Sequence, residues 1–174
     1  MMTEIKSTLD LILEKTKHLT LSEEEKAELR LKEINGKIMG WIQKYRDTTI
    51  KLDSLRSELD LAEKEYGPGN VKNLLKKVLV RSVEPEQDNT PLFDLLEQLI
   101  EENTDILYRL LDTFYRKCDE GKRRLADKIN HALVEKGISG SAIVPNPDKD
   151  EEWKLLHATL LEAFTKQRDL IADN

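Results

Sequence analysis

The spacing of apolar residues between positions 27 and 66 constrains the fold more than any other feature of the sequence. Apolar residues recur there in alternating steps of four and three, and Thr48 fills one position of the pattern. The members are Ala27, Leu31, Ile34, Ile38, Trp41, Tyr45, Leu52, Leu55, Leu59, Ala62 and Tyr66. Such a repeat keeps its apolar residues on one face of an α-helix and is typical of coiled coils. We therefore predict an all-α protein whose long helices pack along narrow apolar seams.

The first long helix is expected over about 23–66. Ser22 followed by Glu25 forms a capping box, in which each side chain accepts a hydrogen bond from the other residue's backbone N–H. The run Asp47-Thr48-Thr49-Ile50 contains weak helix formers. Two alternatives are therefore open: one continuous helix, or two helices joined by a turn near 47–52.

A second long helix is expected over about 91–136, where Leu, Ile and Phe recur at helical spacing without an internal proline. Gly137 then stands where a left-handed residue commonly ends a helix. Shorter helices are expected over about 4–18, 71–82 and 149–172. Seven glycines and five prolines are too few to separate the many short strands of an all-β domain. Residues 1–174 are therefore expected to form a single elongated domain, a helical bundle or antiparallel coiled coil.

Charge and composition exclude several classes of protein. The net charge of −6 lacks the basic footprint of a duplex-binding domain. The single cysteine, Cys118, excludes an internal disulfide and a multi-cysteine zinc site. Residues 1–10 contain no apolar core of a secretory signal, and no run approaches the ~20 apolar residues that cross a bilayer. We expect a cytoplasmic protein that binds neither nucleic acid nor membrane.

The main candidates for catalysis, metal binding or ligand binding are three residues: His131, His157 and Cys118. None of the histidines follows a glutamate by three residues, as the Glu-x-x-His motif of a diiron bundle requires. Cys118 has no histidine within a turn or two that would activate a nucleophilic thiol. Structural roles are therefore favoured, and no catalytic residue, metal ligand or cofactor is predicted. The alternative is a helical-bundle enzyme or ligand-binding protein that uses these three residues.

Charge is unevenly distributed along the second long helix. Residues 82–108 contain eight acidic residues and no Lys or Arg, whereas residues 109–128 contain seven basic and four acidic residues. Two such helices in parallel would place acid against acid. We predict antiparallel packing, with a second copy or the basic helix 71–81 as the neighbour. Nucleic-acid binding would require the cluster Lys122-Arg123-Arg124 to join the basic residues of 71–81 in one stripe.

The segment 137–146 is the candidate interaction surface. Its two glycines permit positive φ angles, and its small side chains permit close approach of another backbone. It would serve as an anion-binding turn or as a strand for a partner, and the simpler alternative is a tight connection between helices. The candidate residues are Gly137, Ile138, Ser139, Gly140, Ser141, Pro145 and Asn146.

Two stretches of the chain resemble a family of small bacterial helical proteins of unknown function. They read Ser7-Thr-Leu-Asp-Leu-Ile-Leu-Glu-Lys-Thr-Lys-His-Leu-Thr-Leu-Ser-Glu-Glu-Glu-Lys26 and Gly137-Ile-Ser-Gly-Ser-Ala-Ile-Val-Pro-Asn146. The resemblance implies a helical protein. It implies no activity and assigns no site residue.

Long apolar seams favour a role in protein assembly, because exposed apolar stripes mark interaction surfaces. The sequence therefore predicts a non-enzymatic helical scaffold or adaptor. It is expected to form a homo-oligomer, most simply a dimer, and to bind a further protein partner.

Overall fold

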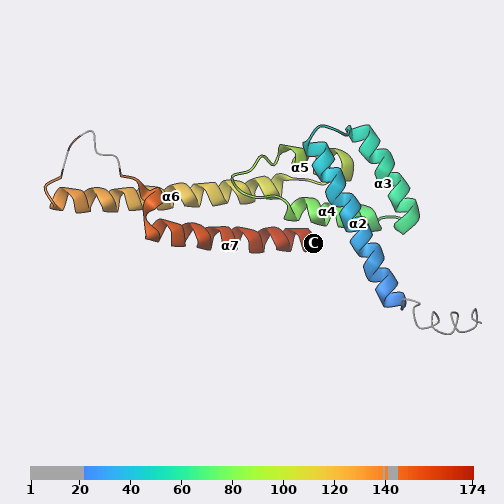
Figure 1. The fold of residues 1–174 in the computed structure, drawn as a ribbon. Helices are drawn as coiled ribbons and strands as arrows, with labels where there is room; N and C mark the ends of the chain where they lie inside the picture. Colours follow the sequence, from blue (N-terminus) through green and yellow to red (C-terminus); the bar gives the residue numbers. More distant parts are fainter. Residues whose placement is uncertain (1–21, 139, 141–144) are drawn as a thin grey trace, which may run out of the picture. The chain divides into compact units, whose positions relative to one another are not determined.

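The computed structural model describes residues 22–138, 140 and 145–174, and every regular element among them is helical. The elements are α2 (Glu23–Arg46), α3 (Leu52–Tyr66), α4 (Asn70–Arg81), α5 (Thr90–Leu95), the π-helical turn η1 (Leu96–Ile100), α6 (Asp105–Glu135), the 3-10 turn η2 (Pro147–Lys149) and α7 (Glu151–Asp173). The all-α prediction is confirmed (Figure 1). No helix in the described ranges is long and apolar enough to cross a membrane.

Contacts divide the chain into two compact units, Met1–Gly40 and Trp41–Asn174. The expectation of a single elongated domain stays a prediction. The helix expected over about 4–18 lies outside the described residues. In the first unit, the Ser22 N–H donates to Glu25 Oε2 at 2.7 Å and the Glu25 N–H donates to Ser22 Oγ at 3.1 Å. The capping box is thus confirmed as the start of α2.

Of the two alternatives for 23–66, the structure has two helices. Thr48 adopts a positive φ of 55°, which a threonine rarely does inside a helix. The Thr49 N–H and hydroxyl both donate to the Lys44 carbonyl, each at 2.9 Å, and so cap the end of α2. The weak helix formers therefore end one helix, and α3 begins at Leu52.

The single helix expected over 91–136 is wrong, because the chain leaves the helix between η1 and α6. Glu101 adopts the left-handed conformation, and the Glu102 N–H donates to the Leu96 carbonyl at 2.9 Å. Asn103 Oδ1 then accepts from the Asp105 N–H at 2.7 Å, which begins α6. The buried Thr104 donates its hydroxyl proton to the Glu97 carboxylate. These side-chain hydrogen bonds take the place of helical backbone hydrogen bonds. The break therefore leaves few polar groups without a hydrogen-bond partner.

The other end of α6 matches the expectation. Gly137 has a φ of 72°, its N–H donates to the Val134 carbonyl at 2.9 Å, and the Ile138 N–H donates to the Leu133 carbonyl at 3.0 Å. This is the pattern of a helix that ends on a left-handed glycine. The 31 residues of α6 span about 46 Å.

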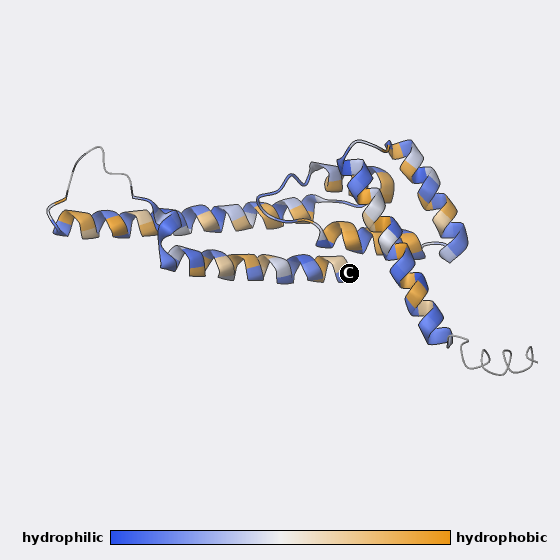
Figure 2. Cartoon of the chain, viewed as in Figure 1, coloured by the Kyte–Doolittle hydropathy of each residue, from blue (hydrophilic) through white to orange (hydrophobic). Residues whose placement is uncertain are grey.

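In the second unit, α7 packs against both α6 and α4. Lys128 near the end of α6 pairs with Glu152 near the start of α7, whereas Phe114, earlier in α6, contacts Phe164, later in α7. Helix α7 therefore runs antiparallel to α6, and Figure 1 shows the two helices side by side. Figure 2 shows apolar and polar residues alternating along both helices, as expected for one buried face on each.

Within the chain, α6 packs antiparallel against α7. The charge distribution had instead predicted a second copy or the basic helix 71–81 as the neighbour. Helix α4 packs against α7 and η1 instead. Lys76 of α4 does pair with Glu102 of the acidic stretch, with Nζ 3.1 Å from Oε1. The attraction between the basic helix and the acidic segment is thus present, while the packing of α6 against a second copy stays a prediction.

Helices α3 and α4 are joined by a turn that one carboxylate organises. Glu63 Oε1 accepts from the Lys72 N–H at 2.6 Å, and its other oxygen accepts from the Gly69 N–H. Both N–H groups belong to the start of α4, where the backbone has no intrahelical acceptor. Glu63 therefore fixes the start of α4 from the neighbouring helix.

Candidate functional site

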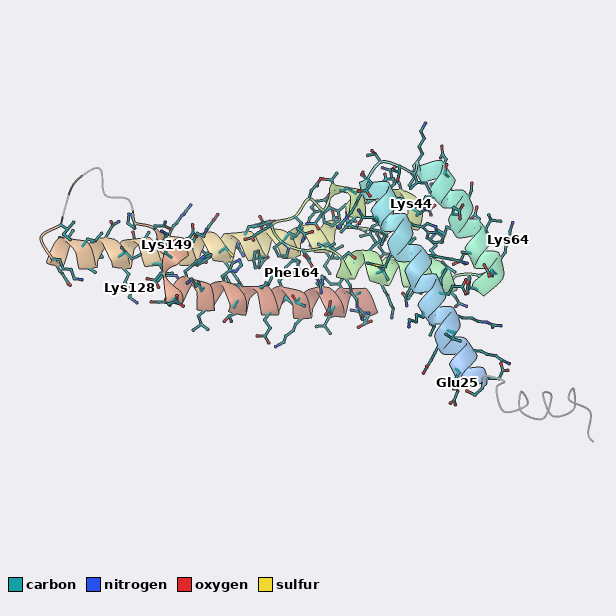
Figure 3. The ribbon with its side chains drawn as sticks, viewed as in Figure 1. Glu25, Lys44, Lys64, Lys128, Lys149 and Phe164 are labelled. Carbon is teal, nitrogen blue, oxygen red and sulfur yellow. The ribbon has the colours of Figure 1, made fainter. Side chains whose placement is uncertain are left out.

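Helices α6 and α7 approach each other closely along their seam at Gly121. A Cβ atom at this position would lie 2.5 Å from Leu156 Cδ2 and 3.3 Å from Trp153 Cζ3. A glycine is therefore required for the observed separation of the two helices. Farther along the seam, the rings of Phe114 and Phe164 meet edge to face with centroids 5.7 Å apart; Figure 3 labels Phe164 between the helices.

One side of this seam is covered by the loop between α4 and α5. The backbone N–H of Glu86 donates to Tyr115 Oη at 3.0 Å, and Glu86 Oε1 lies 3.4 Å from His157 Nε2. The imidazole of His157 also lies against Phe114 and Trp153, with ring centroids 5.8 and 5.5 Å away. His157 is thus a packed side chain with one exposed acidic partner.

Two polar side chains hold this loop in place. Asn89 is buried; its amide donates to the Glu84 carbonyl at 2.8 Å, and its Oδ1 accepts from the Glu84 N–H at 3.2 Å. Arg168 of α7 donates to the carbonyl of the buried Val83 at 3.2 Å. The loop is therefore held on both sides of Glu86, at Val83 and at Asn89, and this positions Glu86 beside His157.

Cys118 is a buried thiol on the same seam. Burial raises its pKa, the Glu86 carboxylate raises it further, and Lys122 opposes both effects. A nucleophilic cysteine needs the opposite shift, because the thiolate is the reactive form. The surroundings of Cys118 are those of a structural thiol.

The structure does not bring all three candidate residues together, because His131 follows Cys118 by 13 positions in α6, about 20 Å, whereas Glu86 contacts His157 and also raises the pKa of Cys118. His131 is exposed in the last turns of α6, and neither histidine makes a hydrogen bond to Cys118 among the described residues. The described part of the chain contains no group of three His, Cys, Asp or Glu side chains that could hold a metal ion. The alternative that assigns chemistry to these residues stays a prediction.

Two hollows open along the seam on α6 and α7. The first has a volume of about 440 Å³ and is lined by Gly121, Arg124, Leu125, Lys128, Glu152, Leu155, Leu156 and Thr159. The second has a volume of about 350 Å³ and is lined by Ile106, Arg109, Leu110, Thr113, Gln167, Leu170 and Ile171. In both hollows α6 contributes an arginine and α7 contributes leucine. Leu155 and Leu170 are 73% and 67% exposed.

The basic residues singled out in the sequence are largely paired within the chain. Lys122 Nζ lies 2.8 Å from Asp148 Oδ1, and this hydrogen bond raises the pKa of Lys122. Arg81 and Lys77 of α4 both contact Asp173, at 2.9 and 3.3 Å. The two basic clusters lie near opposite ends of α7, a helix about 35 Å long, and do not form one stripe along it.

The segment 137–146 is described in part. Gly137 ends α6, and Asn146 Oδ1 accepts from the Asp148 N–H at 3.2 Å to begin η2. Ile138 and Gly140 are exposed, whereas Ser139 and Ser141 lie outside the described residues. The described ends thus have the roles of a connection between helices, and the interaction role stays a prediction.

The close contact at Gly121 and the leucines of the hollows were not identified from the sequence, and only the first of these has a signal in it. Gly121 continues the apolar face of α6 at helical spacing from Phe114 and Cys118, which marks a close approach of a neighbouring helix. The leucines of the hollows were less visible. Leu155 lies outside the three–four stripe of α7, so periodicity does not distinguish it from any exposed residue.

We found no match to the chain among protein-family models, curated proteins or solved structures. The resemblance of residues 7–26 and 137–146 to a small bacterial helical family stays a prediction.

Proposed function

We propose that the protein is a non-enzymatic helical adaptor that binds a protein partner along the α6–α7 pair. One observation carries the proposal: exposed leucines border the two hollows on the same seam. A single exposed leucine is ordinary on a protein surface. One exposed leucine at each of two hollows along the same helix pair fits a surface that binds a helix.

The size of the unburied surface supports the same role. Full burial of a leucine side chain is favourable by about 1.5–3 kcal/mol. Leu155, Leu170 and the 54% exposed Ile106 leave much of this free energy unused in the chain alone. A partner that covered them would gain it, which is how a small number of anchoring residues stabilise an interface.

Affinity capture from the source cells tests this proposal. We expect the unmodified chain to retain a specific protein, and Leu155→Glu combined with Leu170→Glu to lose it. Leu61→Glu is the matched control, because Leu61 is 61% exposed on α3 and lines neither hollow. Equal retention by the unmodified chain and the double variant would contradict the proposal.

Self-association is part of the proposed role as a scaffold. Sedimentation equilibrium at micromolar concentration is expected to give a mass well above that of the 20.1 kDa chain. A mass that stays at one chain over this concentration range would remove the homo-oligomer from the proposal. The adaptor role would then rest on the capture experiment alone.

A further inference from the structure

We infer that the α6–α7 seam binds an acidic amphipathic helix of a protein partner. This inference rests on the proposed function and names the chemistry of the partner. The two leucine-bordered hollows offer apolar contacts to such a helix. Arg109 lines one hollow and Arg124 the other, 15 positions apart in the numbering of one helix, which corresponds to about 22 Å. One partner helix of about 15 residues would span both.

Charge along the seam selects an acidic partner. Arg109 forms no ion pair with any described carboxylate, and Arg124 donates to the Glu120 backbone carbonyl at 3.4 Å rather than to a side chain. On α7, the three acidic residues of this stretch are each paired with a basic residue, and Asp169 Oδ1 lies 2.9 Å from Arg168 Nη2. Glu152 pairs with Lys128, and Glu162 Oε1 lies 2.6 Å from Lys166 Nζ. Among the residues that line the hollows, Arg124, Lys128 and Glu152 together give the first hollow a net positive charge, and Arg109 gives the second one.

A second copy of the chain fits this charge less well. In a face-to-face dimer related by a two-fold axis, the α6 edge of one copy meets either the same basic edge or the α7 edge of the other. The first arrangement opposes Arg109 and Arg124 to like charges. The second offers Glu152, Glu162 and Asp169, which already have lysine or arginine partners. Complementary charge selects partner and orientation, so an acidic helix from another protein is favoured.

Two synthetic peptides probe the inference against the full chain. Both are amphipathic helices of 21 residues with leucine at heptad positions; one carries glutamate at the flanking positions and the other carries lysine. Fluorescence anisotropy measures the affinity of each peptide at about 50 mM and about 500 mM salt. We expect the glutamate peptide to bind roughly tenfold more tightly at low salt, and the difference to shrink at high salt.

Charge reversal of the two hollow arginines gives the sharper result. Arg109→Glu combined with Arg124→Glu is expected to reverse the preference, so that the lysine peptide binds more tightly. Arg116→Glu combined with Arg123→Glu is the matched control: both residues are exposed on α6, both line neither hollow, and the net charge changes equally. The control variant is expected to keep the preference for the glutamate peptide.

Equal binding of the two peptides, or the same effect from both arginine pairs, would overturn the inference. The failure of the inference remains separable from the failure of the proposed function. If neither peptide binds while a captured partner is still lost with Leu155→Glu and Leu170→Glu, the adaptor stands and the acidic helix is wrong. Sedimentation of each variant reports a second copy, because an oligomer lost only with the hollow leucine variants would assign the seam to self-association and would also overturn the inference.

Discussion

Replacement of Gly121 by alanine would measure how much the close α6–α7 contact matters. Alanine is favoured over glycine by about 1 kcal/mol in a helix interior. The added Cβ would lie 2.5 Å from Leu156 Cδ2 and 3.3 Å from Trp153 Cζ3, and such overpacking costs about 1–3 kcal/mol. Leu156 is half-buried beside a hollow and can rotate, whereas Trp153 is buried. We expect Gly121→Ala to lower the free energy of unfolding by about 0–2 kcal/mol, the sum of the two effects.

Gly36→Ala is the reference, because a Cβ at Gly36 in α2 meets no atom within 4 Å. It should raise stability by about 1 kcal/mol through helix propensity alone. The second comparison uses Leu156→Ala, which removes the closest clashing atom. In that background Gly121→Ala should be less harmful by about 1 kcal/mol or more, a coupling that a double-mutant cycle measures.

Urea unfolding followed by circular dichroism at 222 nm gives each free energy, and thermal melts should move by about 2–4 °C per kcal/mol. The reasoning is refuted if Gly121→Ala stabilises the protein as much as Gly36→Ala does. It is also refuted if the effect of Gly121→Ala is the same with and without the Leu156 side chain.

Three further perturbations test the fold and the seam. Because burial raises the pKa of Cys118, its thiol should react with a disulfide reagent at pH 8 much more slowly than a free thiol, and equal rates would contradict its burial. Glu63→Ala leaves two N–H groups of α4 without their acceptor and should cost about 1–2 kcal/mol by urea unfolding, whereas Glu58→Ala on the same helix should cost little. The pKa of Asp173 is lowered from 3.8, first by the hydrogen bond from Lys77, so its stabilising effect is present above that pH and lost as the pH falls through the lowered value. Asp173→Asn should therefore reduce the melting temperature at pH 7 and change it less near pH 3; an equal reduction at both would show that its charge is not responsible.

Features set by a few adjacent residues could be predicted from the sequence. The capping box of Ser22 and Glu25 and the left-handed cap at Gly137 depend on residues within one turn, and both are confirmed. The break between η1 and α6 was missed, although the apolar stripe has a gap of six from Ile100 to Ile106 that the polar run 101–105 fills. Periodicity predicted a continuous helix there. Side-chain hydrogen bonds of Asn103 and Thr104 instead stabilise the break in the helix.

Contacts between distant segments could not be predicted in the same way. The charge gradient along 82–128 favoured an antiparallel neighbour, and α6 does lie antiparallel to α7. Charge alone could not choose between α7 and a second copy, because it does not describe close packing such as the contact at Gly121. The contact of Glu86 with His157 is set by the loop that Asn89 and Arg168 hold, and no spacing rule relates residues 71 positions apart.

Photo-crosslinking from the seam tests the central claim most directly. A photoreactive amino acid placed at Leu155 in the full chain, in the source cells, should form a covalent adduct with one discrete protein. The same amino acid at Leu61, which is similarly exposed but lies away from the hollows, should not form that adduct. The claim predicts an adduct specific to position 155 that disappears when Leu170 is changed to Glu. The same adducts from both positions, or none from position 155, would contradict it.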